Sequence, residues 1–373
     1  MNPFRFGSIV RGDYFYDRKE ESERIISTLA NGNNLVLFAP RRYGKTSLVF
    51  KVIEELEAKG FCCVYFDFLP VYSIESFIVS YIHAIRKKQT NIQRLVKLIS
   101  GAAKNIRPVL SFDNSGNPEL SVNFTENQVS AQTLSDVLDL PEKLASSGKK
   151  TIVFFDEFQE VTKLNKYGFE NLLRSKIQQQ QQVNYLFLGS KTHLLSEMFN
   201  NKNRAFYNSA YHLQLGTLPP KDTIAYLQSK FEMSGIEIGN EEALLLINQA
   251  GDIPYYIQLL AAEIWQYMIT AHTLVTKDII VAAASRIIEL KEDYYHELFD
   301  RQSVMQKKLL ISLTYSGENI FSSGFTKQYR LSAASTTQKS VLSLMDSGII
   351  DKTNNTYFIS DPFFKRYLQN YAF

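Results

Sequence analysis

A lysine and a hydroxyl residue stand side by side at Lys45 and Thr46, after a short apolar run and a loop that ends in Gly44. The order of an apolar strand, a tight loop and Gly-Lys-Thr at a helix start is typical of a phosphate-binding P-loop. Its backbone N–H groups surround phosphate oxygens, its lysine binds the β- and γ-phosphates, and its hydroxyl is a ligand of Mg²⁺. The pattern normally begins with Gly, whereas Ala39 stands there in this chain. The sequence therefore predicts a nucleotide site formed by Ala39, Pro40, Arg41, Arg42, Tyr43, Gly44, Lys45, Thr46 and Ser47.

Two adjacent carboxylates, Asp156 and Glu157, directly follow a second apolar run at residues 151–155. Parallel sheets bind their ligands at the carboxyl ends of the strands, which is where these side chains would lie. There Asp156 would hold Mg²⁺ through water, and Glu157 would act as the base that polarises an attacking water. A strand end followed by a helix-capping acid is the structural alternative. The P-loop on an earlier strand favours the catalytic interpretation.

A third apolar run, residues 186–188, leads into Ser190 and Lys191. If this strand neighbours the P-loop strand, Ser190 or Lys191 would lie near the γ-phosphate, although a serine that caps a helix is the alternative. Hydrolysis also needs a group that stabilises the transferred charge. Arg204, shortly before the last strand of the core, is the favoured arginine finger. The other candidates are Arg174, Arg41 and Arg42.

The elements that must position these residues alternate between strands and helices. Apolar runs at residues 35–38, 62–68, 151–155, 185–188 and, more weakly, 211–215 alternate with helical patterns, two of which span 46–59 and 134–146. Such alternation predicts an α/β fold with a parallel sheet covered on both faces. Residues 90–133 break the rhythm, so we expect an insertion there, with a hairpin that pairs residues 109–112 with 120–124.

Helical patterns dominate after Pro219-Pro220, including one at residues 276–300. The last part of the chain shows three helical patterns followed by two strand-like runs, which is the plan of a winged helix. We therefore expect three domains: a P-loop core at residues 1–218, a helical lid at 219–302 and a winged helix at 303–373.

The composition is that of a globular protein, with 45% hydrophobic and 21% charged residues among 373. A net charge of +3 permits nucleic acid binding without arguing for it. The two cysteines, Cys62 and Cys63, are adjacent in a predicted strand and would point to opposite faces, which fits a reducing compartment. No apolar run is long enough to span a membrane. We expect a cytoplasmic protein with no membrane partner.

The motifs together resemble the archaeal-type, or MNS-clade, AAA+-related ATPases, which are relatives of STAND NTPases and of origin-recognition initiators. The segments that carry the resemblance are residues 2–7, 14–20, 39–48, 155–159, 188–190 and 251–256. Asp17 stands where the family has Gly. The resemblance implies ATP binding, slow hydrolysis coupled to conformational change, and a lid in which Pro254 approaches the base. An ordinary helix start, with proline at its first turn, is the alternative for residues 251–256. It does not name the biological process.

The winged helix leaves the partner open. Its expected recognition helix, residues 335–345, offers Thr337, Gln338 and Lys339, and Lys352 would lie on the wing. Because basic residues are few and phosphate contacts dominate DNA affinity, duplex DNA and a protein partner or second copy both stay as alternatives.

The favoured hypothesis is an ATP-driven switch in which Glu157 activates water and lid motion repositions the winged helix. The alternative is a nucleotide-responsive DNA- or protein-binding module with little hydrolysis. A scaffold that needs no nucleotide is disfavoured, because Lys45-Thr46 and Asp156-Glu157 occur together.

Overall fold

The structure is a computed structural model of the chain. It describes residues 2–10, 12, 15–88, 92–102, 105–112, 118–124, 129–145, 150–268, 273–353 and 355–371. The turns expected near residues 113–117 and at Asn354, and the aromatic residue Tyr14, lie outside the described residues.

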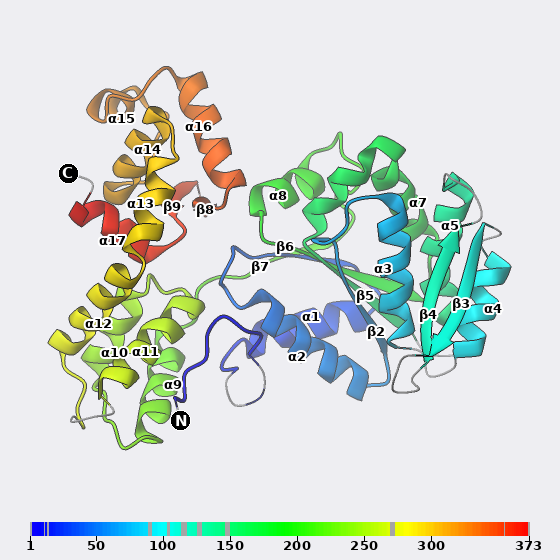
Figure 1. Ribbon diagram of the computed structural model, residues 1–373, viewed down its shortest axis with the longest axis horizontal. Helices are drawn as coiled ribbons and strands as arrows, with labels where there is room; N and C mark the ends of the chain where they lie inside the picture. Colours follow the sequence, from blue (N-terminus) through cyan, green and yellow to red (C-terminus); the bar gives the residue numbers. More distant parts are fainter. Residues whose placement is uncertain are drawn as a thin grey trace.

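Five parallel strands form the central sheet, in the order β2-β5-β6-β1-β7 (Figure 1). The strands are β1 (Leu35–Phe38), β2 (Cys62–Asp67), β5 (Thr151–Asp156), β6 (Val183–Gly189) and β7 (Tyr211–Gln214). Strand β6 lies between β5 and β1, and its Gly189 pairs with Phe38 at the end of β1. Three adjacent strands therefore end at the same edge of the sheet, where they are followed by the P-loop, the carboxylate pair and Ser190. The predicted α/β fold is confirmed.

Helices cover both faces of the sheet, which explains why its strands are continuous apolar runs. Successive side chains of a strand point to opposite faces. Leu35 and Leu37 accordingly pack in one buried cluster, whereas Val36 packs in the other. Two helices, α1 (Lys19–Ala30) and α2 (Lys45–Ala58), belong to the first cluster. The second contains residues of α3 (Ile74–Arg86), α5 (Ala131–Leu138), α6 (Leu140–Ala145), α7 (Phe169–Gln179) and α8 (Thr192–Asn200).

Two parts of the core differ from expectation. The single helix predicted at residues 134–146 is two helices, because Pro141 lacks the N–H that a continuous helix would need there. The insertion contains the predicted antiparallel hairpin, β3 (Ile106–Phe112) and β4 (Pro118–Phe124). It also contains a helix, α4 (Ile92–Ala102), that was not predicted.

The lid consists of helices that pack around one apolar interior: α9 (Pro220–Glu232), α10 (Asn240–Gln249), α11 (Pro254–Met268) and α12 (Lys277–Leu290). The helix predicted at residues 276–300 is interrupted at Lys291, and α13 (Glu292–Asp300) follows. Trp265, the only tryptophan of the chain, is buried in this lid. Its indole Nε1–H donates to Ser234 Oγ at 2.8 Å, which ties α11 to the end of α9.

The winged helix contains α14 (Val304–Tyr315), α15 (Ser323–Gln328), α16 (Ala334–Asp346), β8 (Ile350–Thr353) and β9 (Thr356–Ile359). A last helix, α17 (Pro362–Tyr371), was not predicted. The expectation that Thr337 is available to a partner is wrong, because its side chain is fully buried and its hydroxyl donates to the Ser332 carbonyl. Gln338 and Lys339 are exposed. Within the described residues, no helix has the length and apolarity to cross a bilayer.

Candidate functional site

The predicted P-loop joins β1 to α2 in a conformation suited to an anion. Gly44 caps α2 with φ 81°, a left-handed conformation that favours glycine. The N-terminal turn of α2 presents unpaired backbone N–H groups and the positive end of the helix dipole. Ala39 is fully buried and is not among the residues with positive φ. The backbone at this position therefore does not require glycine, which explains how the loop keeps its shape with alanine.

An ion cluster joins the two predicted motifs. The Lys45 Nζ lies 2.7 Å from Asp156 Oδ1 and 3.2 Å from Glu157 Oε1. The second oxygen of Asp156 accepts a 2.6 Å hydrogen bond from the Tyr65 hydroxyl on β2. Tyr65 was not predicted, because no local pattern connects it to a residue 91 positions away. The cluster places one cation between two carboxylates at the carboxyl edge of the sheet.

The second oxygen of Glu157 is held from the other side. Its Oε2 accepts hydrogen bonds from Ser190 Oγ at 2.7 Å and from Gln159 Nε2 at 2.6 Å. Burial by itself would raise the pKa of Glu157, but Lys45 and the hydrogen bonds from Gln159 and Ser190 outweigh it and lower the pKa to about 2. The Glu157 carboxylate is thus ionised, and both of its oxygens are occupied by donors.

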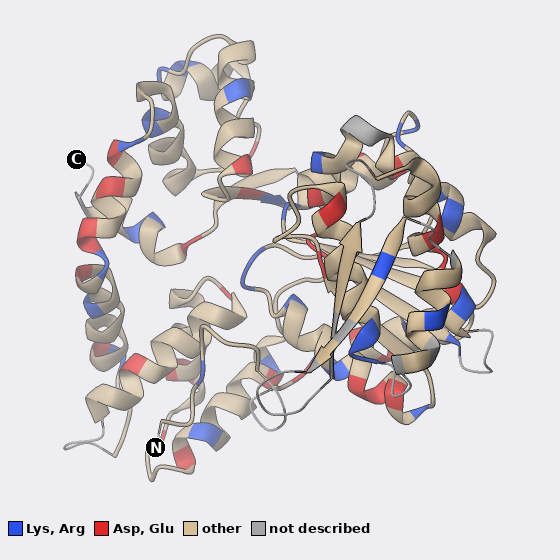
Figure 2. Ribbon diagram, turned by 45° about the vertical axis from the view of Figure 1, so that its right-hand side comes forward, with Lys and Arg blue, Asp and Glu red and all other residues tan. Residues whose placement is uncertain are grey.

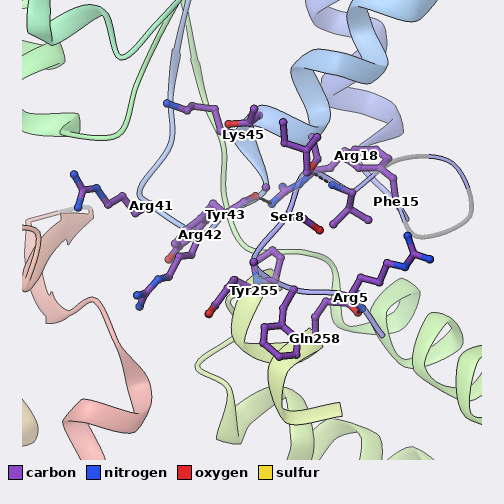
Figure 3. Close-up of a pocket in the computed structure, with 18 of the residues that line it drawn as sticks. Arg5, Ser8, Phe15, Arg18, Arg41, Arg42, Tyr43, Lys45, Tyr255 and Gln258 are labelled. Atoms are coloured by element: carbon purple, nitrogen blue, oxygen red, sulfur yellow. Dashed lines mark hydrogen bonds between the residues drawn. The ribbon is translucent and has the colours of Figure 1, made fainter. Parts of the chain in front are cut away.

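A cavity of about 460 Å³ opens beside this cluster, between the core and the lid (Figure 3). Its lining includes the P-loop with Glu157 and Ser190. It also includes the apolar and aromatic residues Phe15, Tyr16 and Leu218, and Pro254 and Tyr255 from α11, where the Tyr255 N–H donates to the carbonyl of Arg42 in the P-loop. Cavities of 300–1,000 Å³ hold small ligands and cofactors. The size and the mixed lining, which combines the P-loop with aromatic rings, fit a nucleoside triphosphate.

Arg18, which belongs to the segment 14–20 that carries the family resemblance, is a structural residue of this cavity to which the sequence assigned no role. Its side chain is almost fully buried, and its Nη2 donates to the carbonyl of Gly216 at 2.6 Å. The same nitrogen lies 3.5 Å from the carbonyl of Tyr43 in the P-loop. Arg18 therefore connects the P-loop to the segment that leads from the core into the lid. The contact spans about half the chain, so no local pattern could have indicated it.

The predicted arginines separate into two groups. Arg41 and Arg42 line the cavity and extend toward the winged helix (Figure 3). Arg204 does not line it, because its guanidinium is paired with Glu170 at 2.8 Å and with Glu197 at 3.0 Å. Arg174 is also absent from the cavity lining.

The winged helix contacts the core next to the P-loop. Arg42 Nη1 lies 3.3 Å from Asp361 Oδ2, at the start of α17. Thr192, two residues after Ser190, donates to Asp351 on β8 at 3.0 Å. A neighbouring contact joins His193 to Asp346 at the end of α16, at 3.1 Å. Three aspartates of the winged helix thus face residues of the P-loop and of α8.

Arg41 lies between the catalytic edge and the winged helix. Its Nε is 3.5 Å from Ser190 Oγ, at the limit of a hydrogen bond. Its Nη1 would lie 3.3 Å from a Cβ added at Gly348, just before β8. Gly348 has φ 74°, so glycine is favoured there by conformation as well as by the approach of Arg41.

A family model described as an ATPase domain predominantly from Archaea matches residues 15–260. The chain belongs to this family. The match spans the P-loop, the carboxylate pair, Ser190 and Pro254, and a model described as a probable winged helix domain matches residues 293–370. The resemblance to archaeal-type ATPases that the sequence motifs indicated is confirmed.

This archaeal-type ATPase has an uncharacterised relative in Pyrococcus horikoshii, named as an ATP-binding protein. The two are 24% identical over 261 residues, which cover 65% of this chain and 73% of the relative. Among solved structures, the Walker-type ATPase of Pyrococcus abyssi has a TM-score of 0.67 at 17% identity, covering 98% of this chain and 99% of that one. The ADP form of the Aeropyrum pernix ORC2 protein has a TM-score of 0.54 at 14% identity, covering 96% and 93%. Both structures are similar to this chain in fold.

Proposed function

We propose that this ATPase-family chain binds ATP, hydrolyses it with Mg²⁺, and uses the cycle to change the position of its winged helix. The observation that carries the proposal is the convergence of Lys45, Asp156, Glu157 and Ser190 beside one cavity between core and lid. These residues come from two loops and a helix start that are far apart in the sequence. A cation, two carboxylates and a hydroxyl are the groups that phosphoryl transfer to water needs.

Binding would place the triphosphate along the P-loop. The backbone N–H groups at the start of α2 and the Lys45 ammonium would bind phosphate oxygens. The base would lie against the aromatic and apolar part of the lining, which comes from the core through Phe15 and Tyr16 and from the lid through Pro254 and Tyr255. Because both domains would contact the same ligand, loss of the γ-phosphate would change how the lid sits on the core.

The donors for Mg²⁺ are hard oxygen atoms, which this cation prefers. Thr46 offers a hydroxyl at the first turn of α2, and Asp156 offers a carboxylate that is 4% exposed and already faces the P-loop lysine. Bound Mg²⁺ would neutralise part of the charge on the phosphate oxygens.

Glu157 would accept the proton of the attacking water. The water oxygen bonds to the γ-phosphorus, the bond from that phosphorus to its bridging oxygen breaks, and ADP leaves with the electron pair. With Lys45 beside it the Glu157 carboxylate is only weakly basic, since its pKa is about 2. Once Lys45 contacts phosphate, one cause of that low pKa weakens. The pKa of Glu157 would therefore rise when substrate draws Lys45 away, so that Glu157 becomes a better base only in the substrate complex.

The test is turnover by Glu157→Gln, which keeps the shape of the side chain and removes the base. We expect ATP affinity within about threefold of the parent and turnover lowered at least about 100-fold, as loss of a general base implies. Lys163→Gln, at an exposed lysine paired with Glu160, is the control for a surface charge change in the same segment. Equal turnover by parent and Glu157→Gln would contradict hydrolysis by this site.

Contacts beside the P-loop support the proposed coupling to the winged helix. Arg42 belongs to the loop that would hold phosphate and also pairs with Asp361. Ser190 would face the γ-phosphate, and Thr192 two residues later holds Asp351. A shift of either segment on hydrolysis would therefore alter a winged-helix contact. Hydrogen exchange of α16 and β8 should differ between the ATP-bound Glu157→Gln protein and the ADP-bound parent, and identical exchange would contradict the coupling.

Arg204 remains our proposal for an arginine finger, acting on a second copy of the chain, since it does not line its own cavity. Arg204→Ala retains Glu157, whereas Glu157→Gln retains Arg204. If the finger acts between copies, a mixture of these two inactive variants should recover part of the parental turnover. A mixture as inactive as its components would remove this role.

We propose that the winged helix binds either duplex DNA or a protein. The exposed side of α16 offers Gln338 and Lys339, but Lys339 is the one basic residue of that helix. Figure 2 shows acidic and basic positions interspersed over the winged helix. DNA binding through phosphates should weaken steeply with salt. Duplex binding that responds to neither salt nor ATP would leave the protein partner.

A further inference from the structure

We infer that Gln159 is a positioning residue that holds the Glu157 carboxylate in the orientation needed for ATP hydrolysis. The inference rests on the proposed function, because it concerns the base of that reaction. Gln159 does not line the cavity and would not touch the nucleotide.

Gln159 is fixed on a buried part of the core. It lies in the 3₁₀ segment Phe158–Tyr167 that follows Glu157. Its neighbour Phe158 is fully buried against aromatic rings, among them Phe187 at 4.7 Å and Phe206 at 5.0 Å between ring centroids. The backbone on which the Gln159 side chain stands is therefore held by packing. Gln159 itself is only 2% exposed.

The amide of Gln159 is directed at one oxygen of Glu157. Its Nε2 donates to Glu157 Oε2 at 2.6 Å and lies 3.5 Å from Glu160 Oε1. Ser190 Oγ donates to the same Glu157 oxygen at 2.7 Å. Two donors from different elements thus fix Oε2, and Oε1 is left facing Lys45. When Lys45 turns to phosphate, Oε1 becomes the oxygen that can accept a proton.

The amide oxygen of Gln159 indicates a functional role for this side chain. Gln159 Oε1 is buried and has no hydrogen-bond partner among the described residues. An orphaned buried acceptor destabilises a fold, so an apolar side chain would serve packing better at this position. The amide is therefore explained by its hydrogen bond to the Glu157 carboxylate.

Gly189 provides the space that the amide occupies. A Cβ at this position would lie 2.3 Å from Gln159 Oε1 and 3.3 Å from Leu195 Cδ2. Gly189 does not have positive φ, so its backbone does not require glycine. The clash at 2.3 Å falls on the end of a side chain that can move. A methyl group there should displace the Gln159 amide from Glu157 while the fold is kept.

The first experiment is Gln159→Met, which preserves length and removes both amide groups. We expect kcat to fall about 10- to 100-fold, as misplacement of a catalytic group by about 1 Å implies. The affinity for ADP should stay within about threefold, whereas the thermal midpoint without nucleotide should fall only slightly, because Lys45 and Ser190 still hold the Glu157 carboxylate. Gln132→Met is the matched control, because Gln132 is exposed on α5 and pairs locally with Asp136. An unchanged kcat, or a large fall in midpoint and ADP affinity together with kcat, would overturn the inference.

The second experiment asks whether Gly189 acts through Gln159. Gly189→Ala should lower kcat in the parent but have no effect in a Gln159→Ala background, where the vacated space accepts the methyl group. An equal loss in both backgrounds would mean that the methyl group acts through Ser190 instead, and would overturn the inference. If Glu157→Gln abolishes turnover while the Gln159 and Gly189 variants do not change it, the proposed function stands and this inference alone fails. If the parent shows no turnover, both fail together.

Discussion

Replacing Lys45 with Met should destabilise the ATPase core even when no nucleotide is present. Its Nζ lies 2.7 Å from Asp156 and 3.2 Å from Glu157, and all three side chains are at most 20% exposed. At an effective dielectric constant of about 20 the two attractions sum to roughly 11 kcal/mol, most of which offsets the cost of burying three ions. Tyr65 and Ser190 would still donate to the carboxylates. We therefore expect the low end of the range for a broken buried pair, about 3 kcal/mol.

For a core of about 200 residues, that loss corresponds to a fall of roughly 6–12 °C in the thermal midpoint. The assay is circular dichroism melting at pH 7 without nucleotide or Mg²⁺. Lys59→Met, at the exposed end of the same helix, is the control and should melt with the parent. Adding Asp156→Asn to Lys45→Met should recover part of the midpoint, because it removes one uncompensated charge. A Lys45→Met protein that melts at or above the parental midpoint would refute the reasoning.

Three further outcomes are expected. Glu157 has a folded-state pKa of about 2 against an ordinary 4.5, so its contribution to the free energy of unfolding is present above about pH 4.5 and is lost toward pH 2. Urea unfolding should show this loss of stability in the parent and a smaller loss in Lys45→Met. Asp361→Asn keeps a cap for α17 but weakens the pair with Arg42, in which the arginine is 40% and the aspartate 14% exposed. Exchange in α17 should therefore rise by a factor of about 2–5, equivalent to roughly 0.5–1 kcal/mol, and unchanged exchange would mean that the pair contributes nothing. Ala39→Gly should leave ATP affinity within about threefold, since position 39 does not have positive φ, whereas a large gain would show that the alanine impairs the loop.

The sequence was sufficient to predict the parallel sheet and the polar residues at its carboxyl edge, because a local pattern indicates each strand and the residues that follow it. An apolar run that ends in Gly44-Lys45-Thr46 or in Asp156-Glu157 places its own polar residues at a strand end. The order of the strands then brings these ends together, and β6 between β5 and β1 brings Ser190 to Glu157. The roles that we propose for these residues rest on the chemistry of their side chains.

The remaining parts depend on contacts that no local pattern encodes. Arg18 and Tyr65 act on groups about 200 and 91 positions away. Thr337 was expected at the exposed side of α16, but helical phase turns it toward the interior, where it bonds to Ser332. Gln159 belongs to the segment 155–159 that carries the family resemblance, but the positioning role that we propose for it depends on its contacts with Glu157 and on the space left by Gly189 on another strand.

The single tryptophan has a practical consequence for spectroscopy. Trp265 lies inside the lid and bonds to Ser234, so excitation near 295 nm reports the lid and leaves the core silent. A lid that rotates as a rigid body keeps this indole buried, and its emission maximum should not move. A lid that melts exposes it and shifts the emission to the red. The protein thus carries its own label for telling domain rotation from local unfolding, without any added dye.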